Sequence, residues 1–435
     1  MRTAIGLDMG TTRIKASLVG ETREELALAS ELTPWVMAAG QLQFDLNLVG
    51  DIALRLAAQV AERGRASGHE ILGLAVTGMG ETGALLDAGG KVLAPGYAWH
   101  HSLGDPTRLT RHFGADEYMI HTGREPNSVP SLAKLDYLRV QGHRFAPGQT
   151  WLNVPDYVAF RLTGVRAAEI SLASRSALLD IPTGKWWEDA FEFLGAGTWL
   201  VPEQTAASGS ALGAANGEIP EVLKGITVAT GGHDHPMAAL AFGGAQIGTL
   251  NVSLGTAEAQ VRIEASVDDA QRLALVRAGA GVDWHPFADR FTVLRPLSTG
   301  MTMERLSMLL GADTRESRRE LSLAALEAEP SRIRLLDVGN DGFGIADISD
   351  KVTRAGAWRA AAEQLVADSA AVTREMNAIL GEPKRINTFG GWLFDPLVAH
   401  LRRALGQVAS AGEPAEPGAF GAALMAFKAC GLELS

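Results

Sequence analysis

The chain has 435 residues, of which 46% are hydrophobic and 20% charged. Because a single hydrophobic core stops growing at about 250–300 residues, this length predicts two domains, and the composition excludes a largely disordered chain. Lys and Arg number 39 against 50 Asp and Glu, a formal net charge of −11, which argues against a nucleic-acid partner. The single cysteine, Cys430, excludes an internal disulfide and fits a reducing cytoplasm.

The first residues and the hydropathy pattern argue against export and membrane insertion. Asp8 interrupts any apolar core of a signal peptide. No apolar run approaches the roughly 18 residues that a membrane helix needs. We therefore expect a cytoplasmic protein without a membrane segment.

Strands and helices alternate along the chain, which predicts the α/β class. In the first half, strands are predicted at 3–7, 13–19, 26–29 and 71–76, and a hairpin at 85–93 that turns at Gly89-Gly90. Helices are predicted at 47–63 and 155–162. Apolar strands follow at 226–229 and 247–252, and a last helix is predicted at 420–429, after a loop at 413–418. Glycines cluster between residues 241 and 249, where we place the boundary between domains 1–244 and 245–435.

One internal similarity relates the two halves. The sequence Leu-Asp-Met-Gly-Thr-Thr at residues 7–12 resembles Val-Ser-Leu-Gly-Thr-Ala at residues 252–257. Each follows a short apolar strand and precedes an alternating one. Gly-Thr is common, and the similarity alone is weak evidence, yet a matching hairpin in each half suggests a duplicated domain.

A glycine-rich match to the dinucleotide fingerprint is rejected. Residues 78–83 read Gly-Met-Gly-Glu-Thr-Gly and follow a predicted strand. The fingerprint requires a helix next, with its N-terminus directed at the pyrophosphate. Here a strand and a turn follow, so we expect no Rossmann site, and the chain also lacks a Walker-type loop.

The two Gly-Thr hairpins are candidate phosphate-binding loops. Glycine lets backbone N–H groups approach a phosphate closely, and the threonine hydroxyl adds a donor. Asp8 could bind Mg²⁺ directly or through water, and Lys15 could neutralise phosphate charge. Each hairpin taken alone is more simply a turn, but the matched pair favours phosphate binding.

Residues 230–236 read Thr-Gly-Gly-His-Asp-His-Pro and combine a strand end with a helix start. Asp234 or His235 could cap the helix that Pro236 opens. A metal site at His233, Asp234 and His235 is less favoured, since adjacent strand residues point to opposite faces. We prefer Asp234 as a general base for a substrate hydroxyl, a role that is compatible with capping.

Taken together, these motifs resemble those of the FGGY carbohydrate kinases. The resemblance rests on their order along nearly the whole chain: Asp8-x-Gly10-Thr11-Thr12-x-x-Lys15, 156–164, 174–180, Gly231-Gly232-His233-Asp234-His235, Ser253-Leu254-Gly255-Thr256 and Gly390-Gly391. It implies two ribonuclease-H-like (actin-like) domains with ATP in the cleft between them. It also implies phosphate transfer to a sugar, ketose or polyol.

The resemblance assigns roles by position. It implies Asp8 as the Mg²⁺ ligand and Asp234 as the catalytic base. It implies four acceptor contacts, at Glu81, Thr82, Trp99 and His235. It implies contacts to the phosphates and the nucleoside from Thr11, Thr12, Lys15, Gly255, Thr256, Gly300, Gly390 and Gly391. Gly80 stands where glycerol kinases carry an arginine before the glutamate.

Two further segments differ from the family pattern. The family usually carries a Gly-Glu-Arg-x-Pro stretch where this chain reads Asp-Val-Gly-Asn-Asp-Gly-Phe-Gly at 337–344. After the double glycine, Asp395 and His400 stand in place of an asparagine and a glutamine. If Asp395 reaches the base, it accepts from adenine or guanine, so we expect weak discrimination between ATP and GTP.

The sequence thus predicts an ATP- and Mg²⁺-dependent kinase for a small polyhydroxylated acceptor, with a homodimer left open. The alternative from another class is a non-catalytic actin-like protein, either a sugar sensor or a filament former. A chaperone-like ATPase, which would hydrolyse ATP without sugar, is the least favoured interpretation.

Overall fold

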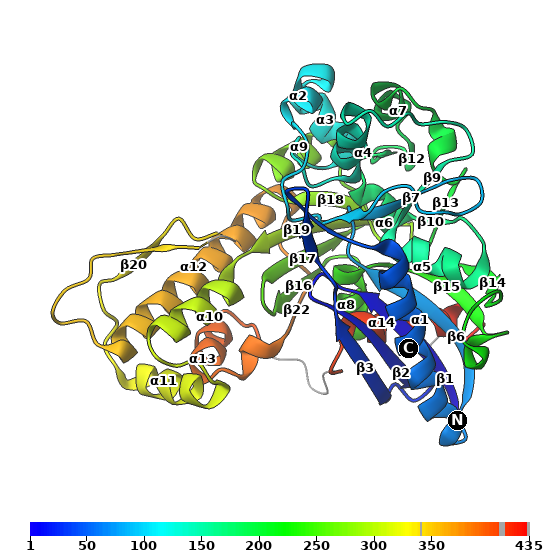
Figure 1. The fold of residues 1–435 in the computed structure, drawn as a ribbon. Helices are drawn as coiled ribbons and strands as arrows, with labels where there is room; N and C mark the ends of the chain where they lie inside the picture. The colour runs from blue at the N-terminus through cyan, green and yellow to red at the C-terminus, as the bar shows by residue number, and fades with distance from the viewer. Residues whose placement is uncertain (340–341, 409–413, 433–435) are drawn as a thin grey trace.

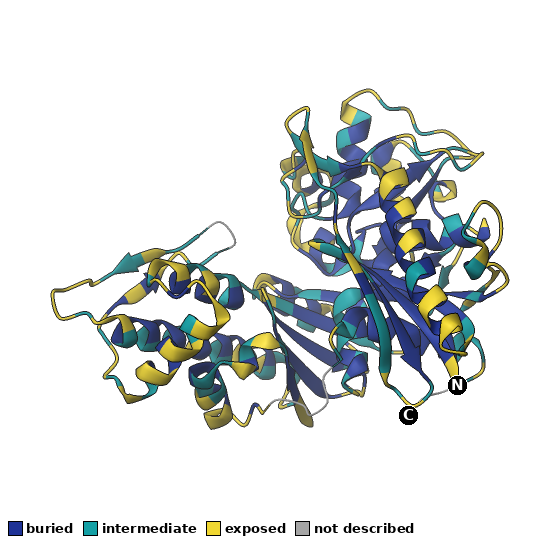
Figure 2. Ribbon diagram, turned by 60° about the horizontal axis from the view of Figure 1, so that its bottom comes forward, coloured by how far each residue is buried: buried dark blue, intermediate teal, exposed yellow. Residues whose placement is uncertain are grey.

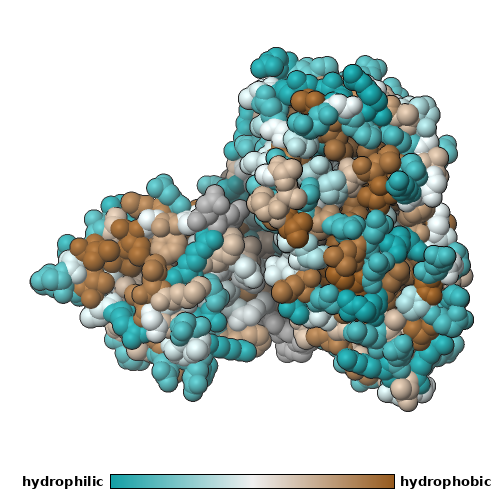
Figure 3. Space-filling view, viewed as in Figure 1, coloured by the Kyte–Doolittle hydropathy of each residue, from teal (hydrophilic) through white to brown (hydrophobic). Residues whose placement is uncertain are grey.

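The computed structural model describes residues 1–339, 342–408 and 414–432. Its two main sheets lie in two connected bodies, with a smaller helical lobe extending from the second (Figure 1). A notch separates this lobe from the larger body on the face seen in Figure 3. The fold class is the predicted one, α/β, and no helix of the described residues is long and apolar enough to cross a membrane.

The first sheet has six strands in the order β14-β15-β6-β1-β2-β3. Strand β1 pairs antiparallel with β2 and parallel with β6, which pairs parallel with β15. Nearly every residue of β1 is buried, as expected for a central strand covered on both faces. The strands are β1 (Arg2–Met9), β2 (Arg13–Gly20), β3 (Glu25–Leu32), β6 (Glu70–Gly78), β14 (Ala211–Ala214) and β15 (Thr227–His233).

The second sheet repeats this plan with five strands in the order β18-β19-β17-β16-β22. Strand β16 pairs antiparallel with β17 and parallel with β22, as β1 does with β2 and β6. The predicted duplication of the hairpin is therefore visible in the strand topology. The strands are β16 (Thr249–Leu254), β17 (Glu258–Glu264), β18 (Gly281–Trp284), β19 (Phe291–Leu297) and β22 (Arg385–Phe389).

Helices cover both faces of the first sheet, and their outward sides are exposed (Figure 2). Helix α1 (Leu46–Ala66) begins at the cap Asp45, whose carboxylate accepts from the Asn47 amide at 2.8 Å. It packs with α5 (Val154–Thr163) over one face. The other face is covered by α8 (Asp234–Ala241) and by α14 (Pro417–Ala429), the last helix of the chain.

Helix α14 lies against the first sheet although it follows the second in sequence. A Cβ on Gly6 in β1 would come within 1.7 Å of the Ala419 carbonyl oxygen, so the helix backbone touches the strand. A Cβ on Gly421 would likewise meet the Met237 carbonyl oxygen of α8 at 2.0 Å. The predicted division at 244/245 therefore does not hold for α14, whose apolar face completes the core of the first body.

A cap of short elements surmounts the first sheet, with its own core around Tyr118, Leu135 and Phe191. Its helices are α2 (Thr107–Phe113), α3 (Ala115–Thr122), α4 (Ser131–Val140), α6 (Ile170–Arg175), α7 (Glu188–Leu194) and η1 (Thr198–Leu200). Its strands are β4 (Val36–Ala38), β5 (Gln41–Phe44), β7 (Gly83–Leu86), β8 (Gly96–Tyr97), β9 (Thr150–Asn153), β10 (Ala168–Glu169), β11 (Leu179–Asp180), β12 (Lys185–Trp186) and β13 (Thr205–Ala206). The short helix η2 (Glu221–Leu223) packs instead against α1 in the core of the first body.

The helical lobe packs around the fully buried Trp358. It contains α10 (Thr299–Leu309), α11 (Arg315–Glu327), α12 (Arg354–Leu380), η3 (Gly391–Phe394), α13 (Pro396–Ala404) and the strand pair β20 (Arg334–Leu336) and β21 (Gly344–Ala346). The segment noted at 337–344 begins directly after β20 and ends at the first residue of β21, and its residues 340–341 lie outside the described residues. Residue 413 of the predicted loop at 413–418 lies outside them as well.

The edge strand β18 of the second sheet docks onto the cap of the first body. The Val282 amide donates to the Gly123 carbonyl at 2.9 Å. From α9 (Asp269–Arg277), Arg272 donates to the Ile120 carbonyl at 3.1 Å. These contacts bring side chains of the second body close to the glycine-rich loop that follows β6.

Most predicted elements are confirmed, and one is only partly formed. The predicted hairpin at 85–93 turns as expected, with the Gly90 amide donating to the Asp87 carbonyl. Its second arm, however, is a single bridge from Val92 to Leu86 rather than a strand. Strand β7 pairs instead with β9, because the cap supplies that edge. No helix follows residues 78–83, which agrees with the rejection of a Rossmann site.

Candidate active site

Asp8 and Lys15 face each other across the first hairpin. They are direct partners in the antiparallel register of β1 and β2. Burial raises the pKa of Asp8 to about 7, Lys15 opposes this rise, and the nearby carboxylates of Asp234 and Glu416 add to it. The Lys15 ammonium also pairs with Glu416 at 2.5 Å. Lys15 is therefore held at the cleft by two carboxylates.

The surroundings of Asp8 suit a cation. Its Oδ1 is buried and has no hydrogen-bond partner, which is costly unless a ligand fills the position. Among the described residues, no group of three or more His, Cys, Asp or Glu side chains could hold a metal ion. This includes the predicted alternative at His233, Asp234 and His235. A Mg²⁺ ion that arrives with nucleotide phosphates needs only one or two carboxylates, so Asp8 fits that mode of binding.

The turn of the first hairpin is braced by two tryptophans. Trp35 donates to the Thr11 carbonyl at 2.6 Å, and Trp99 donates to the Thr11 hydroxyl oxygen at 2.8 Å. Thr12 is exposed at the tip. Trp99, predicted to line the acceptor pocket, thus also contacts the predicted phosphate-binding loop.

Asp234 is the first residue of α8, directly after strand β15. Burial raises its pKa to about 6, while the His235 amide, which donates to Oδ1 at 2.7 Å, and Arg175 oppose the rise. The N-cap position belongs to His233, so neither Asp234 nor His235 occupies it. A carboxylate with this pKa is ionised at neutral pH yet remains a competent proton acceptor.

Two neutral histidines flank Asp234. Burial lowers the pKa of His233 well below its ordinary value, and burial together with Arg175 lowers the pKa of His235 to about 4. His233 Nε2 lies 3.2 Å from Asp234 Oδ1, which is a contact between a neutral imidazole and a carboxylate. His235 is half-buried beside it, where the sequence predicts an acceptor contact.

Glu81 lies in a buried charge cluster that joins both bodies. Its carboxylate accepts from Arg175 Nε at 2.6 Å and lies 3.7 Å from Arg124 Nη1. Asp283 on β18 accepts from Arg175 at 3.1 Å and pairs with Arg124 as well. Glu81 itself has a left-handed φ of 63°, a conformation that costs free energy in a residue other than glycine.

Arg175 occupies the space that Gly80 leaves open. A Cβ on Gly80 would lie 2.9 Å from Arg175 Cβ and 3.2 Å from its Nε. The arginine missing from the glycine-rich loop is thus replaced in space by one from α6. Thr82 is fully buried, and its hydroxyl donates to the Tyr97 carbonyl at 2.9 Å. In this position Thr82 supports the loop from within, and its hydroxyl is already committed.

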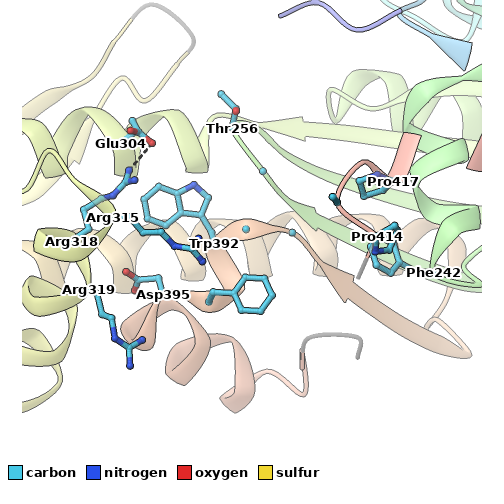
Figure 4. A pocket seen from close by; sticks show the side chains of 15 residues that line it. Phe242, Thr256, Glu304, Arg315, Arg318, Arg319, Trp392, Asp395, Pro414 and Pro417 are labelled. Atoms are coloured by element: carbon cyan, nitrogen blue, oxygen red, sulfur yellow. Dashed lines mark ion pairs between the residues drawn. The ribbon is translucent and has the colours of Figure 1, made fainter. Parts of the chain in front are cut away.

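A cavity of about 910 Å³ opens beside the second hairpin, and its lining includes Gly255, Thr256, Gly390 and Gly391. Figure 4 shows Arg315, Arg318 and Arg319 of α11 along one side and Trp392 at its centre. Arg318 pairs with Glu304 at 2.7 Å and lies over the Trp392 ring. The cavity is large enough for a nucleotide and offers both aromatic surface and cationic groups.

Gly300, which the resemblance places at the nucleoside, and Asp395, considered above as a contact to the base, both have close partners within the protein. A Cβ on Gly300 would come within 2.0 Å of the Gly255 carbonyl oxygen, so Gly300 supports the second hairpin from behind. Asp395 lines the cavity, but Oδ1 accepts from the Leu397 and Val398 amides and Oδ2 from Ser322 at 2.6 Å. Asp395 is the cap of α13, and this geometry does not support it as a base reader.

Sequence reasoning missed three groups of this site. Arg175 lies within the segment 174–180, so the family-like motif carried a signal for it. Arg124 and Asp283 carried no such signal, because Arg124 meets Glu81 from a distant part of the chain and Asp283 meets Arg124 only through the docking of β18. The arginines of α11 were missed for a similar reason, since a helix surface rich in arginine is usually solvated.

The comparisons with known proteins decide the family. The profile of the FGGY family of carbohydrate kinases, N-terminal domain, matches residues 3–241. The chain belongs to the FGGY family of carbohydrate kinases. The profile match therefore confirms the resemblance that the motifs of this FGGY chain suggested.

Curated relatives are 25–28% identical to this FGGY chain over an aligned stretch of 265 residues. An L-fuculokinase of Salmonella typhi is 28% identical over 265 residues, 58% of this chain and 54% of the relative. A xylulose kinase of Bacillus subtilis is 27% identical, over 59% of this chain and 52% of the relative. A glycerol kinase of Thermococcus gammatolerans is 25% identical, over 59% and 52%. The chain spans about half the length of the curated relatives it matches.

Solved structures of FGGY kinases share the whole fold. The xylulose kinase of Rhodospirillum rubrum superposes with a TM-score of 0.86 at 23% identity, covering 98% of this chain and 91% of that one. The Plasmodium falciparum glycerol kinase with ADP superposes with a TM-score of 0.85 at 15% identity, covering 98% and 89%. The predicted pair of actin-like domains is thereby confirmed as the fold.

Proposed function

We propose that this protein transfers the γ-phosphoryl group of ATP to a hydroxyl of a small sugar, ketose or polyol. One observation carries the proposal. Asp234 interacts electrostatically with Glu81 and Arg175 of the predicted acceptor side and with Lys15 of the predicted phosphate side. A group in that position is suited to take a proton from an acceptor hydroxyl while a phosphate chain lies opposite.

The residues divide the work as follows. Asp234 accepts the proton of the attacking hydroxyl, and the neutral His233 orients its carboxylate. Thr11, Thr12, Gly255 and Thr256 hold the phosphate oxygens, and Lys15 offsets their charge. Asp8 would hold Mg²⁺, which supplies charge neutralisation on the phosphates when bound. Glu81, Arg175 and His235 orient the acceptor, and the buried cluster with Asp283 keeps them in place.

The deciding experiment is a coupled assay for ADP formation against a panel of ketoses, aldoses, deoxy-sugars and polyols. We expect turnover with at least one acceptor, and we expect Asp234→Asn to lower kcat by about 10²–10⁴ while sparing both KM values. The matched control is Asp189→Asn on the exposed side of α7, which should behave as the unaltered protein. Turnover by Asp234→Asn at a near-normal rate would remove Asp234 from the mechanism.

The alternative outcome has its own meaning. If none of the acceptors on the panel leads to ADP formation, the kinase proposal is contradicted and a non-catalytic actin-like sensor or filament former is favoured. ADP formation without any acceptor would point to a simple ATPase. The homodimer stays a prediction, which light scattering of the purified protein tests directly.

A further inference from the structure

A second buried acid lies behind the turn that carries Asp234. Glu169 is completely buried at the end of β10, where it caps α6. Its Oε2 accepts from the Ser171 hydroxyl at 2.6 Å and from the Leu172 amide at 2.9 Å. Its Oε1 lies 3.0 Å from the Ser208 hydroxyl oxygen. The proposed phosphoryl transfer gives this acid no role.

The hydrogen bonds of the Ser208 hydroxyl place a proton on Glu169. The Ser208 hydroxyl has one proton and two neighbouring oxygens, the Gly231 carbonyl at 2.7 Å and Glu169 Oε1 at 3.0 Å. A carbonyl can only accept, and its contact is the shorter one, so Ser208 donates to Gly231. Glu169 Oε1 then faces a lone pair of Ser208. That contact is repulsive for a carboxylate and a hydrogen bond for a protonated acid.

The electrostatic surroundings agree with a neutral acid. Burial raises the pKa of Glu169 to about 7. The ionisable groups around it are Asp156 on α5, His233 on β15 and Lys428 on α14. Burial and the neighbouring Glu169 raise the pKa of Asp156 well above its ordinary value, and burial lowers the pKa of His233 well below its ordinary value. The Lys428 ammonium contacts the Ser208 carbonyl at 3.4 Å and not the Glu169 carboxyl.

The Glu169 network grips the turn from two sides. Ser171 accepts from the His233 amide at 2.9 Å, and Ser208 donates to the Gly231 carbonyl. Gly232 between them has a φ of 101°, and a Cβ there would lie 2.7–3.2 Å from the Ser208, Ser171 and Glu169 oxygens. The three side chains thus pack directly against the left-handed turn at Gly232.

We infer that Glu169 is a positioning residue for Asp234: its protonated carboxyl, through Ser171 and Ser208, fixes the turn 231–233 that carries the proposed base. The inference rests on the proposed function for the meaning of Asp234, but not for the network itself. Ionisation of Glu169 draws the Ser208 proton away from Gly231. The turn then loses one of its three side-chain hydrogen bonds and keeps those of Ser171 and of Thr77, whose hydroxyl donates to the Gly232 carbonyl at 2.6 Å.

The test uses an isosteric variant that behaves as the protonated acid at every pH. In Glu169→Gln the amide oxygen accepts from Ser171 and Leu172, and the amide nitrogen donates to Ser208. Ser208→Ala removes the link to Gly231 without touching the cap of α6. Thr122→Val is the matched control, because it removes a buried hydroxyl that donates to the Tyr118 carbonyl at 2.6 Å in α3.

The measurement is hydrogen exchange of residues 229–236 in the full chain without ligands, as protection factors at about pH 6 and about pH 8.5. We expect the unaltered protein and Thr122→Val to lose about fivefold in protection at the higher pH, the worth of one hydrogen bond. In Glu169→Gln, the protection factors at the two pH values should agree within about twofold. In Ser208→Ala, the protection factors should be lowered at both pH values. An equal loss in Glu169→Gln, or full protection in Ser208→Ala, would overturn the inference.

Activity gives a second readout once an acceptor has been identified. The kcat of the unaltered enzyme should fall above about pH 7 with the acceptor KM unchanged, and Glu169→Gln should remove that fall. A protein that turns over no acceptor contradicts the proposed function and leaves the exchange result to decide on Glu169. A kinase whose Glu169→Gln variant retains the alkaline fall contradicts the inference alone.

Discussion

At the scale of single residues, the site is defined by acids that burial makes reluctant to ionise. The pKa of Asp8 and that of Asp234 are both raised, to about 7 and about 6, with burial as the main cause. Each carboxylate therefore gains from a partner that arrives with the substrates, whether a cation or a proton. Burial of these carboxylates lowers the stability of the ligand-free protein and prepares the site to bind its substrates.

The pKa of Asp234 predicts the acid side of the pH profile. Because the base must be ionised, kcat/KM should fall about tenfold per pH unit below about pH 6, separately from the fall above about pH 7 that ionisation of Glu169 predicts. A raised pKa in the folded state also means that Asp234 favours folding below about pH 4 and that this contribution is lost as pH rises through about 6. Asp234→Asn should therefore unfold at the same or a higher temperature at pH 8, with a gain of up to about 2 kcal/mol.

Calorimetry and pH-dependent initial rates check both halves of that prediction. A flat rate profile between about pH 5 and about pH 8 would contradict the assignment of the limb to Asp234. A large loss of stability in Asp234→Asn at pH 8 would show that its bond to the His235 amide outweighs the cost of ionisation.

Glu81 gives a second prediction at this scale. Glu81→Ala should raise the acceptor KM by about tenfold to a hundredfold and leave the ATP KM nearly unchanged, since it frees Arg175 from its 2.6 Å bond. Glu81→Gln is the control, because it keeps an acceptor for Arg175 and removes the charge. Steady-state kinetics with each substrate varied in turn decides the matter; parallel shifts of both KM values would count against an acceptor role.

At the scale of elements, the segment η3–α13 determines how the cavity meets a nucleotide base. Its acid, Asp395, is committed to the amides of α13 and to Ser322. Trp392 and Phe394 offer stacking surface, which is tolerant of base identity. We therefore keep the expectation of weak nucleotide discrimination, now based on stacking rather than on Asp395.

The prediction is that kcat/KM for ATP and for GTP differ by about tenfold or less, whereas a site built on one hydrogen-bond pattern reaches 10⁴–10⁵. Asp395→Asn and Asp395→Ala should leave this ratio unchanged. Only the alanine variant should lose stability, by about 0.5–2 kcal/mol, because asparagine still caps the helix. A ratio that shifts in both variants would restore Asp395 as a base reader.

At the scale of the whole molecule, sequence reasoning captured what is local. The paired hairpins at residues 7–12 and 252–257, the strand-to-helix turn at Asp234 and the resulting family follow from short motifs, each within one element pair. Sequence reasoning did not predict the contacts between elements that lie far apart in the chain. Asp283 reaches Arg124 and Arg175, the partners of Glu81, only because β18 docks on the cap. Helix α14 packs against the first sheet, and nothing in its own sequence indicates this partner.

That return of α14 has a consequence for the order in which the protein is made. During synthesis, β1, β6, β15 and α8 emerge long before residues 417–429, so the part of the sheet face that α14 covers stays exposed until those residues leave the ribosome. A chain that stops at residue 244 should accordingly be insoluble or bind hydrophobic dyes, and a synthetic peptide of residues 414–432 added during refolding should rescue it. Comparing the soluble yield with and without that peptide checks this. A well-folded, monomeric 1–244 fragment would show that the first body folds without α14.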